Sequence, residues 1–109
     1  MIWGSQYDAM MRWMQYNGVD VTSTDSSKLQ NAERNIGSIT GGENNKDVIN
    51  NVYDLLGNRY EWTQEANLTS YRVLRGGDYL YAHSPSLRSN TNPSNDLAYS
   101  GSRFTLYIK

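Results

Sequence analysis

The spacing of apolar residues near the start of the chain predicts one amphipathic helix. The apolar stripe consists of Tyr7, Met10, Met11 and Met14, at positions i, i+3, i+4 and i+7. We expect the helix to run from about Gln6 to Tyr16, with Ser5 as its N-cap and Asn17-Gly18 as its C-terminal stop. The stripe is expected to pack in the core, and an adaptable methionine-rich groove is the alternative. Trp3 and Trp13 are expected in the core or at its edge.

The segment from residue 51 to residue 77 predicts a turn followed by two short strands. Gly57-Asn58 is a turn signal because both residues tolerate positive φ. Tyr60 and Trp62 then occupy alternate positions, as aromatic residues on one face of a strand do. A polar break at residues 65–70 precedes a second β-prone run at residues 71–75. Gly76-Gly77 allows the backbone to bend there, or another segment to pass close to it.

The remaining segments predict a C-terminal strand and a long central loop. Residues 102–109 alternate between apolar and polar side chains, which indicates a strand with one buried face, so truncation from Leu106 onward should unfold the domain. Residues 22–50 show no periodicity, and we expect an ordered loop, with disorder around residues 22–28 as the alternative. The expected apolar anchors of this loop are Ile36, Ile39, Val48 and Ile49.

Composition narrows the classes of function. A chain of 109 residues with a net charge of -1 fits one domain and offers no basic field for nucleic acid or an anionic membrane surface. No apolar run is long enough for membrane insertion. The absence of cysteine excludes disulfides, thiolate catalysis and cysteine-bound metals. His83 is the only histidine, which argues against a catalytic triad and against a histidine-based metal site.

Three runs of residues, in this order along the chain, resemble the signature of a known family. They are Asp54–Thr63 (DLLGNRYEWT), Arg72–Gly77 (RVLRGG) and Gly101–Phe104 (GSRF), and Ser5–Met10 is a weaker fourth match. Together they resemble the formylglycine-generating, or sulfatase-modifying factor, branch of the C-type-lectin fold. The resemblance implies one loop-rich α+β C-type-lectin-like domain over residues 1–109, with one clear amphipathic helix and a small, mainly antiparallel sheet. The family's usual first strand and helix are missing upstream, so we expect an N-terminally reduced fold, a fragment, or a sheet completed by a neighbouring chain.

The same resemblance bears on cofactors. The enzymes of this branch use a pair of cysteines with copper, and that activity does not carry over to a chain without cysteine. Members can also bind calcium near the asparagine and glutamate of the signature, which here are Asn58 and Glu61, with Asp54 nearby. The alternative is that Asn58 makes the turn and Glu61 accepts hydrogen bonds from the backbone or an arginine. We expect no cofactor, and calcium is the only ion that we keep as a candidate.

Residues 78–102, which we call the window, carry the candidate binding residues. The window is rich in Tyr, Ser, Asn and Asp, as antibody-like contact surfaces are, although loops use the same residues. It contains no Lys, Glu, Gln, Met or Trp, which make up about one residue in five elsewhere in the chain. Asparagine codons have the form AAY and end in a pyrimidine, and no codon that ends in a pyrimidine encodes these five types. Changes at the two adenines of asparagine codons would therefore leave this pattern. The window therefore resembles that of variable proteins of diversity-generating retroelements, a group related in fold to phage receptor-binding proteins.

These observations predict a non-enzymatic module that binds a protein or glycan ligand on a cell or particle surface, in a phage virion or on a bacterial surface. The candidate ligand-binding residues are Asp78, Tyr79, Tyr81, His83, Ser84, Ser86, Ser89, Asn90, Asn92, Asn95, Asp96 and Tyr99. Leu87, Arg88 and Leu97 are expected to be structural. One alternative is a structural or interaction domain of a phage or bacterial surface protein without a variable site. A relative of the formylglycine-generating enzymes is the other.

Overall fold

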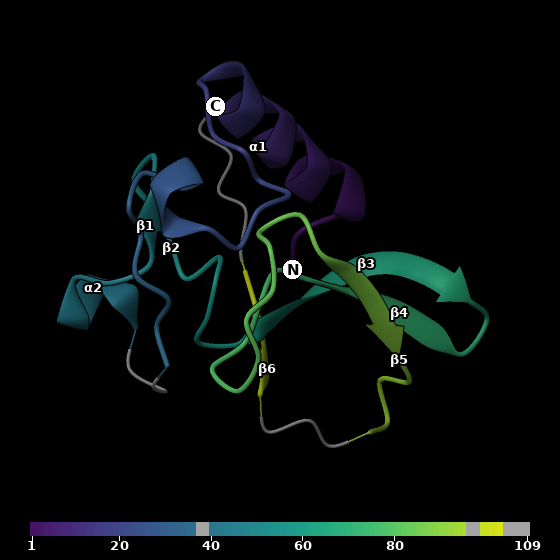
Figure 1. Cartoon of the computed structure of the whole chain (residues 1–109). Helices are drawn as coiled ribbons and strands as arrows, with labels where there is room; N and C mark the ends of the chain where they lie inside the picture. Colours follow the sequence, from purple (N-terminus) through teal and green to yellow (C-terminus); the bar gives the residue numbers. More distant parts are fainter. Residues whose placement is uncertain (37–39, 96–98, 104–109) are drawn as a thin grey trace, which may run out of the picture.

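The computed structural model describes residues 1–36, 40–95 and 99–103. The helices are α1 (Gly4–Tyr16) and the one-turn α2 (Gly41–Asn44), with a 3-10 turn at Ser26–Lys28; the strands are β1 (Val48–Ile49), β2 (Val52–Tyr53), β3 (Tyr60–Leu68), β4 (Tyr71–Arg75), β5 (Arg88–Thr91) and β6 (Ser100–Ser102). Helix α1 lies over one side of the main sheet, and β1, β2 and α2 lie beside the sheet (Figure 1). The predicted α+β class, with one main helix and a small sheet, is therefore confirmed.

The main sheet has the strand order β5-β4-β3-β6. Strand β4 is antiparallel to both β3 and β5, whereas β6 runs parallel to β3. Side chains on the two faces alternate along β3, so Glu61 and Thr63 point toward α1 while Tyr60 and Trp62 point away from it. We call the face that carries Tyr60 and Trp62 the open face. Strands β1 and β2 form a separate antiparallel pair.

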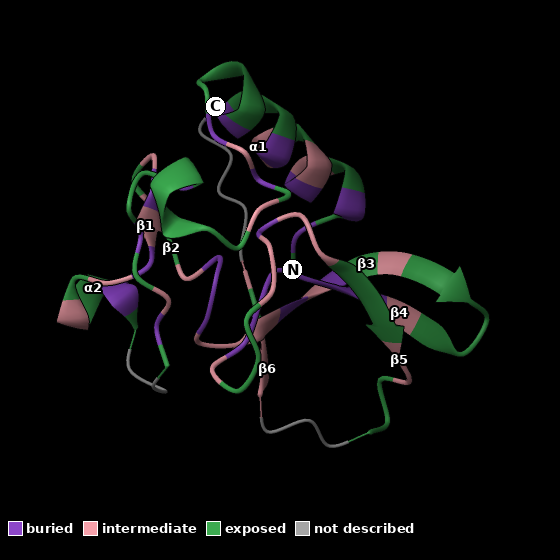
Figure 2. Ribbon diagram, viewed as in Figure 1, coloured by how far each residue is buried: buried purple, intermediate pink, exposed green. Residues whose placement is uncertain are grey.

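Helix α1 follows its predicted pattern at its C-terminus and on its buried face. Tyr7, Met11 and Met14 are buried in the core, and Met10 packs against it. The helix stops at Asn17, and Gly18 follows with a positive φ of 85°. Figure 2 shows the buried side of α1 turned toward the sheet and its loops.

Three predictions about the start and the flanks of α1 are wrong. The N-cap is Trp3 and not Ser5, because the helix begins at Gly4 and the side-chain oxygen of Gln6 accepts a hydrogen bond from the Trp3 amide at 2.8 Å. Trp3 itself is 53% exposed because it precedes the first helical turn. Trp13 is 50% exposed, because it is rotated by about 100° from the buried Met14 that follows it.

The central loop has fewer apolar anchors than predicted. Ile49 is fully buried and Val48 is partly buried, but Ile36 is 65% exposed because the neighbouring Asn35 occupies the inward position. Ile39 lies outside the described residues. At residues 22–28 the structure has a 3-10 turn, in which the Asp25 carboxylate accepts a hydrogen bond from the Ser27 amide. This turn agrees with an ordered loop and not with the alternative of disorder.

The strand predictions hold for β4 and fail for the end of β3. Strand β4 spans the predicted residues 71–75. Strand β3 continues to Leu68, through the predicted polar break, because residues 66 and 68 still pair with β4. Only Thr69 and Ser70 remain for the turn. Of the predicted C-terminal strand, residues 104–109, and with them the truncation prediction, lie outside the described residues.

Candidate ligand-binding surface

The middle of the window is attached to the core by Arg75 and Tyr7. Arg75 is buried and donates hydrogen bonds to Asp8 Oδ1 at 2.6 Å and to the carbonyl oxygen of Leu87 at 3.0 Å. Its guanidinium lies 4.6 Å from the ring centroid of Tyr7. The Tyr7 hydroxyl donates to the carbonyl oxygen of Pro85 at 2.8 Å. The helix and the sheet thus hold this part of the window through main-chain atoms.

Gly77 and Asp78 fix the start of the window. A Cβ atom at Gly77 would overlap the carbonyl oxygen of Leu56, so the close approach predicted for Gly76-Gly77 is confirmed. Asp78 Oδ1 accepts hydrogen bonds from the amides of Leu80 at 3.0 Å and Tyr81 at 2.7 Å. Because Asp78 is fully buried while it holds this turn, the prediction that its side chain faces a ligand is wrong.

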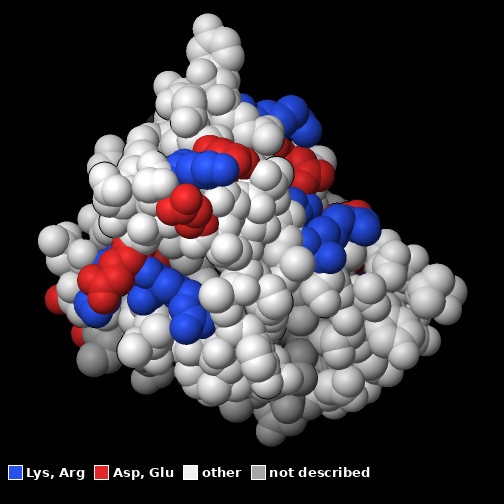
Figure 3. Space-filling view, in the orientation of Figure 1, with Lys and Arg blue, Asp and Glu red and all other residues white. Residues whose placement is uncertain are grey.

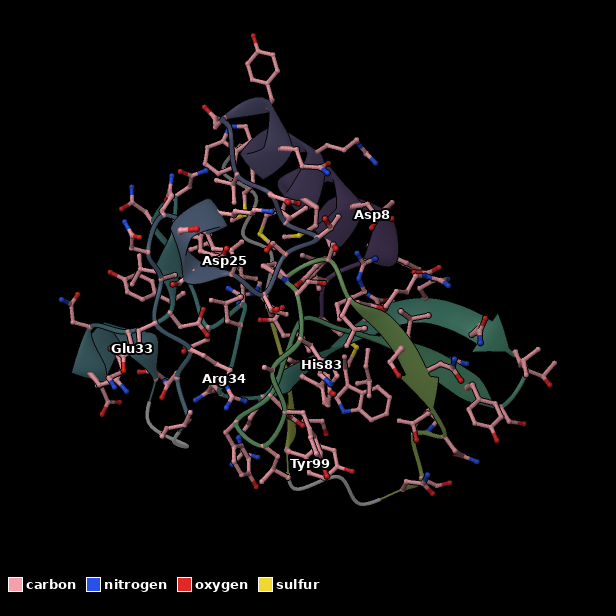
Figure 4. The ribbon with its side chains drawn as sticks, in the orientation of Figure 1. Asp8, Asp25, Glu33, Arg34, His83 and Tyr99 are labelled. Carbon is pink, nitrogen blue, oxygen red and sulfur yellow. The ribbon has the colours of Figure 1, made fainter. Side chains whose placement is uncertain are left out.

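Four rings gather at the edge of the open face, and we call them the aromatic cluster. They are the rings of Tyr60, Tyr81, His83 and Tyr99. The Tyr60 centroid lies 5.8 Å from that of His83 and 6.1 Å from that of Tyr99, and the Tyr81 and His83 centroids are 6.3 Å apart. The Tyr60 amide also donates to the carbonyl oxygen of Tyr99 at 2.9 Å. Figure 4 shows His83 and Tyr99 on the side of the sheet opposite α1.

Tyr60 was not among the predicted binding residues, although it touches two of them. It lies in the first signature run, before the window, and the only sequence signal for it was its alternation with Trp62. Burial raises the pKa of Tyr60 to about 12, and the charge of Asp78 and the neighbouring Tyr99 and Tyr81 add to the shift. Its phenol is therefore neutral at physiological pH and can donate a hydrogen bond.

The described part of the window exposes little charge. In the view of Figure 3, lysine, arginine, aspartate and glutamate side chains gather over α1 and beside α2, and the lower part of the molecule is white among the residues drawn. Within the described part of the window, the charged residues are Asp78, which is buried, and Arg88, which pairs with Glu65. From the window itself a ligand would meet aromatic area and neutral polar groups, while Glu33 and Arg34 of the central loop line the same hollow as His83.

The structure does not bring all predicted binding residues onto one face. Tyr81, Ser89, Asn90 and Asn95 are exposed, whereas Tyr79, His83, Ser84, Ser86, Asn92 and Tyr99 are half-buried. Ser89 and Asn90 are neighbours on β5, so their side chains point to opposite faces. The Ser86 amide donates to the carbonyl oxygen of Val21 at 3.0 Å, which places Ser86 near the core. Asp96 and the expected structural residue Leu97 lie outside the described residues.

The weak calcium candidates are engaged in other contacts. Glu61 is buried, and its carboxylate accepts hydrogen bonds from Arg103 Nε at 2.8 and 2.9 Å. Burial raises the pKa of Glu61, and Arg103 opposes the shift. Asp54 accepts a hydrogen bond from the Gly41 amide at 2.9 Å, and Asn58 makes the turn with a φ of 60°. Among the residues that the structure describes, no group of three or more acidic, histidine or cysteine side chains could hold a metal ion.

Comparison of the chain with protein-family models, with curated proteins and with solved structures gave no match. Within the described ranges, no helix has the length and apolar character that a bilayer crossing requires. The function is therefore inferred from the surface itself and from the sequence of the window.

Proposed function

We propose that this protein is a non-enzymatic ligand-binding module of the C-type-lectin fold, whose window is diversified by a retroelement. Its ligand is a protein or glycan on a cell surface, and the module belongs to a phage virion or a bacterial surface. The observation that carries the proposal is the aromatic cluster. Three of its four rings, Tyr81, His83 and Tyr99, come from the window, and they meet Tyr60 of the framework.

The way in which the window is held supports diversification. Tyr7 and Arg75 bind the carbonyl oxygens of Pro85 and Leu87, and main-chain atoms are the same whatever side chain a residue carries. The Tyr79 amide likewise donates to the carbonyl oxygen of Asn58 at 3.0 Å. The backbone of the window can therefore keep its course while exposed side chains such as Tyr81 are replaced.

The chemistry of the surface supports ligand binding. Tyrosine offers a large and rigid area with a polar tip, at a low cost in side-chain entropy on binding. Half-buried rings such as those of Tyr60 and Tyr99 are already oriented by their neighbours. Such preorganised aromatic residues are the usual high-energy contacts of binding surfaces.

A second candidate function is a structural or interaction domain that uses α1. Trp13 and Tyr16, three residues apart on one side of this helix, are 50% and 91% exposed. Large exposed aromatic residues on a helix are typical of a protein contact. This function would place the binding energy on α1 and not in the window.

The test replaces Tyr79, Tyr81 and Tyr99 together by alanine and measures thermal melting and binding to a glycan array and to intact cells of several bacterial species. We expect binding by the original chain, its loss in the triple variant, and a melting temperature lowered by only a few degrees. A matched variant, Trp13→Ala with Tyr16→Ala, should bind normally. Collapse of the melting transition in the triple variant, or loss of binding in the α1 variant alone, would contradict the proposal.

Diversification has its own test at the level of DNA. We expect a near-identical repeat of the window's coding sequence, beside a reverse transcriptase gene. The two copies should differ only where the repeat has adenine. Differences at other bases, or differences between close relatives spread evenly along the chain, would favour an invariant interaction domain.

A further inference from the structure

A cavity of about 620 Å³ lies next to Trp62 on the open face. Its lining residues are Met1, Trp62, Thr63, Gln64, Arg72 and Pro93. Trp62 lies two residues after Tyr60 on β3, so both side chains point to the same face. The volume falls within the range of small-ligand sites.

Among the described residues that line this cavity, Arg72 is the only one with a charged side chain. Its guanidinium donates one hydrogen bond, to the carbonyl oxygen of Tyr71 at 3.2 Å, and it forms no ion pair with any carboxylate in the described part of the chain. The cavity beside Glu61 differs, because Asp54 and Glu61 face the arginines that line it. Arg72 is half-buried, and the guanidinium donors that no described residue uses can bind a carboxylate through two parallel hydrogen bonds.

Trp62 gives the cavity an aromatic wall in a fixed orientation. Its indole Nε1–H donates to the Ser100 hydroxyl at 3.1 Å, which ties the ring to β6. The negative π face of an indole attracts the C–H groups of a sugar ring, which carry partial positive charge. Met1 and Pro93 add apolar contact, and Gln64 adds an amide.

We propose that this cavity binds a carboxylate-bearing sugar residue of an acidic glycan. Arg72 binds the carboxylate, and the sugar ring packs against Trp62. Both residues lie outside the window, so these two contacts stay the same while the window side chains around them vary. The inference rests on the proposed ligand-binding function and narrows its ligand to an acidic glycan.

The test follows the indole N–H signal of Trp62 by NMR during titration with methyl glucuronide, its neutral counterpart methyl glucoside, and N-acetylaspartate amide. Trp62→Phe assigns the signal. We expect a saturable shift with methyl glucuronide, and at least tenfold weaker binding of methyl glucoside, because a hydrogen-bonded charge pair contributes more than one tenfold step. Comparable affinity for both sugars, or no saturable shift, would overturn the proposal. If N-acetylaspartate amide bound and methyl glucuronide did not, the proposal would be overturned in favour of a protein carboxylate as the ligand.

Variants of Arg72 separate the carboxylate contact from folding. Arg72→Gln should weaken methyl glucuronide at least tenfold, and Arg72→Lys should retain part of the affinity because it keeps the charge but not the paired donors. The control is Arg88→Gln, which alters an arginine paired with Glu65 on the neighbouring strand and should not affect binding. The alanine variant of Tyr79, Tyr81 and Tyr99 should still bind methyl glucuronide. A result against ligand binding by the window and a result against this subsite can therefore be distinguished.

Discussion

At the bends of this chain, buried carboxylates bind backbone amides that have no strand or helix partner. Asp47 is fully buried, and its two oxygens accept hydrogen bonds from the amides of Leu55 at 3.1 Å, Leu56 at 2.9 Å and Gly57 at 2.6 Å. Asp78 holds the first turn of the window in the same way. Burial raises the pKa of Asp47, and these hydrogen bonds oppose the shift. Each aspartate thus stabilises a bend from within the core.

The backbone angles explain why asparagine and aspartate are frequent between residues 45 and 58. Asn45, Asn50 and Asn58, among others, have φ values between 48° and 60°, a left-handed conformation that these short side chains tolerate. The sequence showed only that this segment is polar and has no periodicity. The bonds of Asp47 to residues eight to ten positions away could not be predicted, because they depend on the course of the folded loop.

The titration of Tyr60 is a prediction at the residue scale. Its pKa is raised from 10.0 to about 12, so the folded state holds this proton more tightly than the unfolded chain does. The stability that follows from this difference is fully present below pH 10 and is lost as the pH rises from 10 to about 12. Tyrosinate absorbance should show one phenol titrating near 12 that is absent in Tyr60→Phe. Asp78→Asn should lower this pKa, and an unchanged value would contradict the role given to the Asp78 charge.

At the scale of elements, the sequence predicted features that depend on one segment better than features that depend on strand pairing. The stripe of α1 and the span of β4 followed from sequence because each depends on the side-chain period of one segment. The length of β3 depends on its partner, since Ala66 and Leu68 stay in the strand only because β4 continues to pair with them. Trp13 shows the same limit, because its large apolar ring suggested burial although its position on the helix did not.

Removal of the Arg75 side chain tests how α1, β4 and the window are joined. Arg75→Ala should lower the free energy of unfolding by about 2 to 4 kcal/mol, because it removes a buried charge with several hydrogen bonds and a stacked ring. The control is Arg88→Ala. Arg88 lies opposite Arg75 on β5, and its exposed ion pair with Glu65 should contribute at most about 1 kcal/mol. Urea unfolding measures both values.

The same variant should loosen the window before the whole domain unfolds. The Leu87 amide donates to the carbonyl oxygen of Ser84 at 3.0 Å, within the segment that Arg75 holds. Its hydrogen exchange should be faster in Arg75→Ala than the loss of global stability explains. Equal effects of Arg75→Ala and Arg88→Ala, on stability and on this amide, would contradict the linking role of Arg75.

At the scale of the molecule, the arrangement of strands decides which residues can meet a ligand together. The parallel pairing of β6 with β3 brings Tyr99 beside Tyr60, and the turn held by Asp78 brings Tyr81 and His83 to the same edge. The sequence indicated the window and most of its aromatic residues. The sequence could not show which of Ser89 and Asn90 points to which face, because the face of each residue depends on the strand register.

A library experiment tests whether the framework folds independently of the side chains that it presents. One library randomises Tyr79, Tyr81, His83, Ser89 and Tyr99 with codons that end in a pyrimidine. A second library randomises the buried residues Tyr7, Val21, Ile49, Leu55 and Val73 in the same way. Most members of the first should unfold cooperatively at temperatures close to that of the original chain, because substitutions of partly exposed side chains change stability by about 0.5 kcal/mol each.

Most members of the second library should fail to fold, because each position loses apolar burial and leaves a cavity or a buried polar group. Protease resistance of the displayed chains measures the folded fraction in both libraries. If the two fractions were equal, the exposed rings of the window would be as necessary to the fold as the core, and a surface rewritten by mutation could not be maintained. A clear excess of folded members in the first library would show that the contacts left unchanged in it, among them those of Tyr7 and Arg75 with the main chain, are sufficient to hold the window.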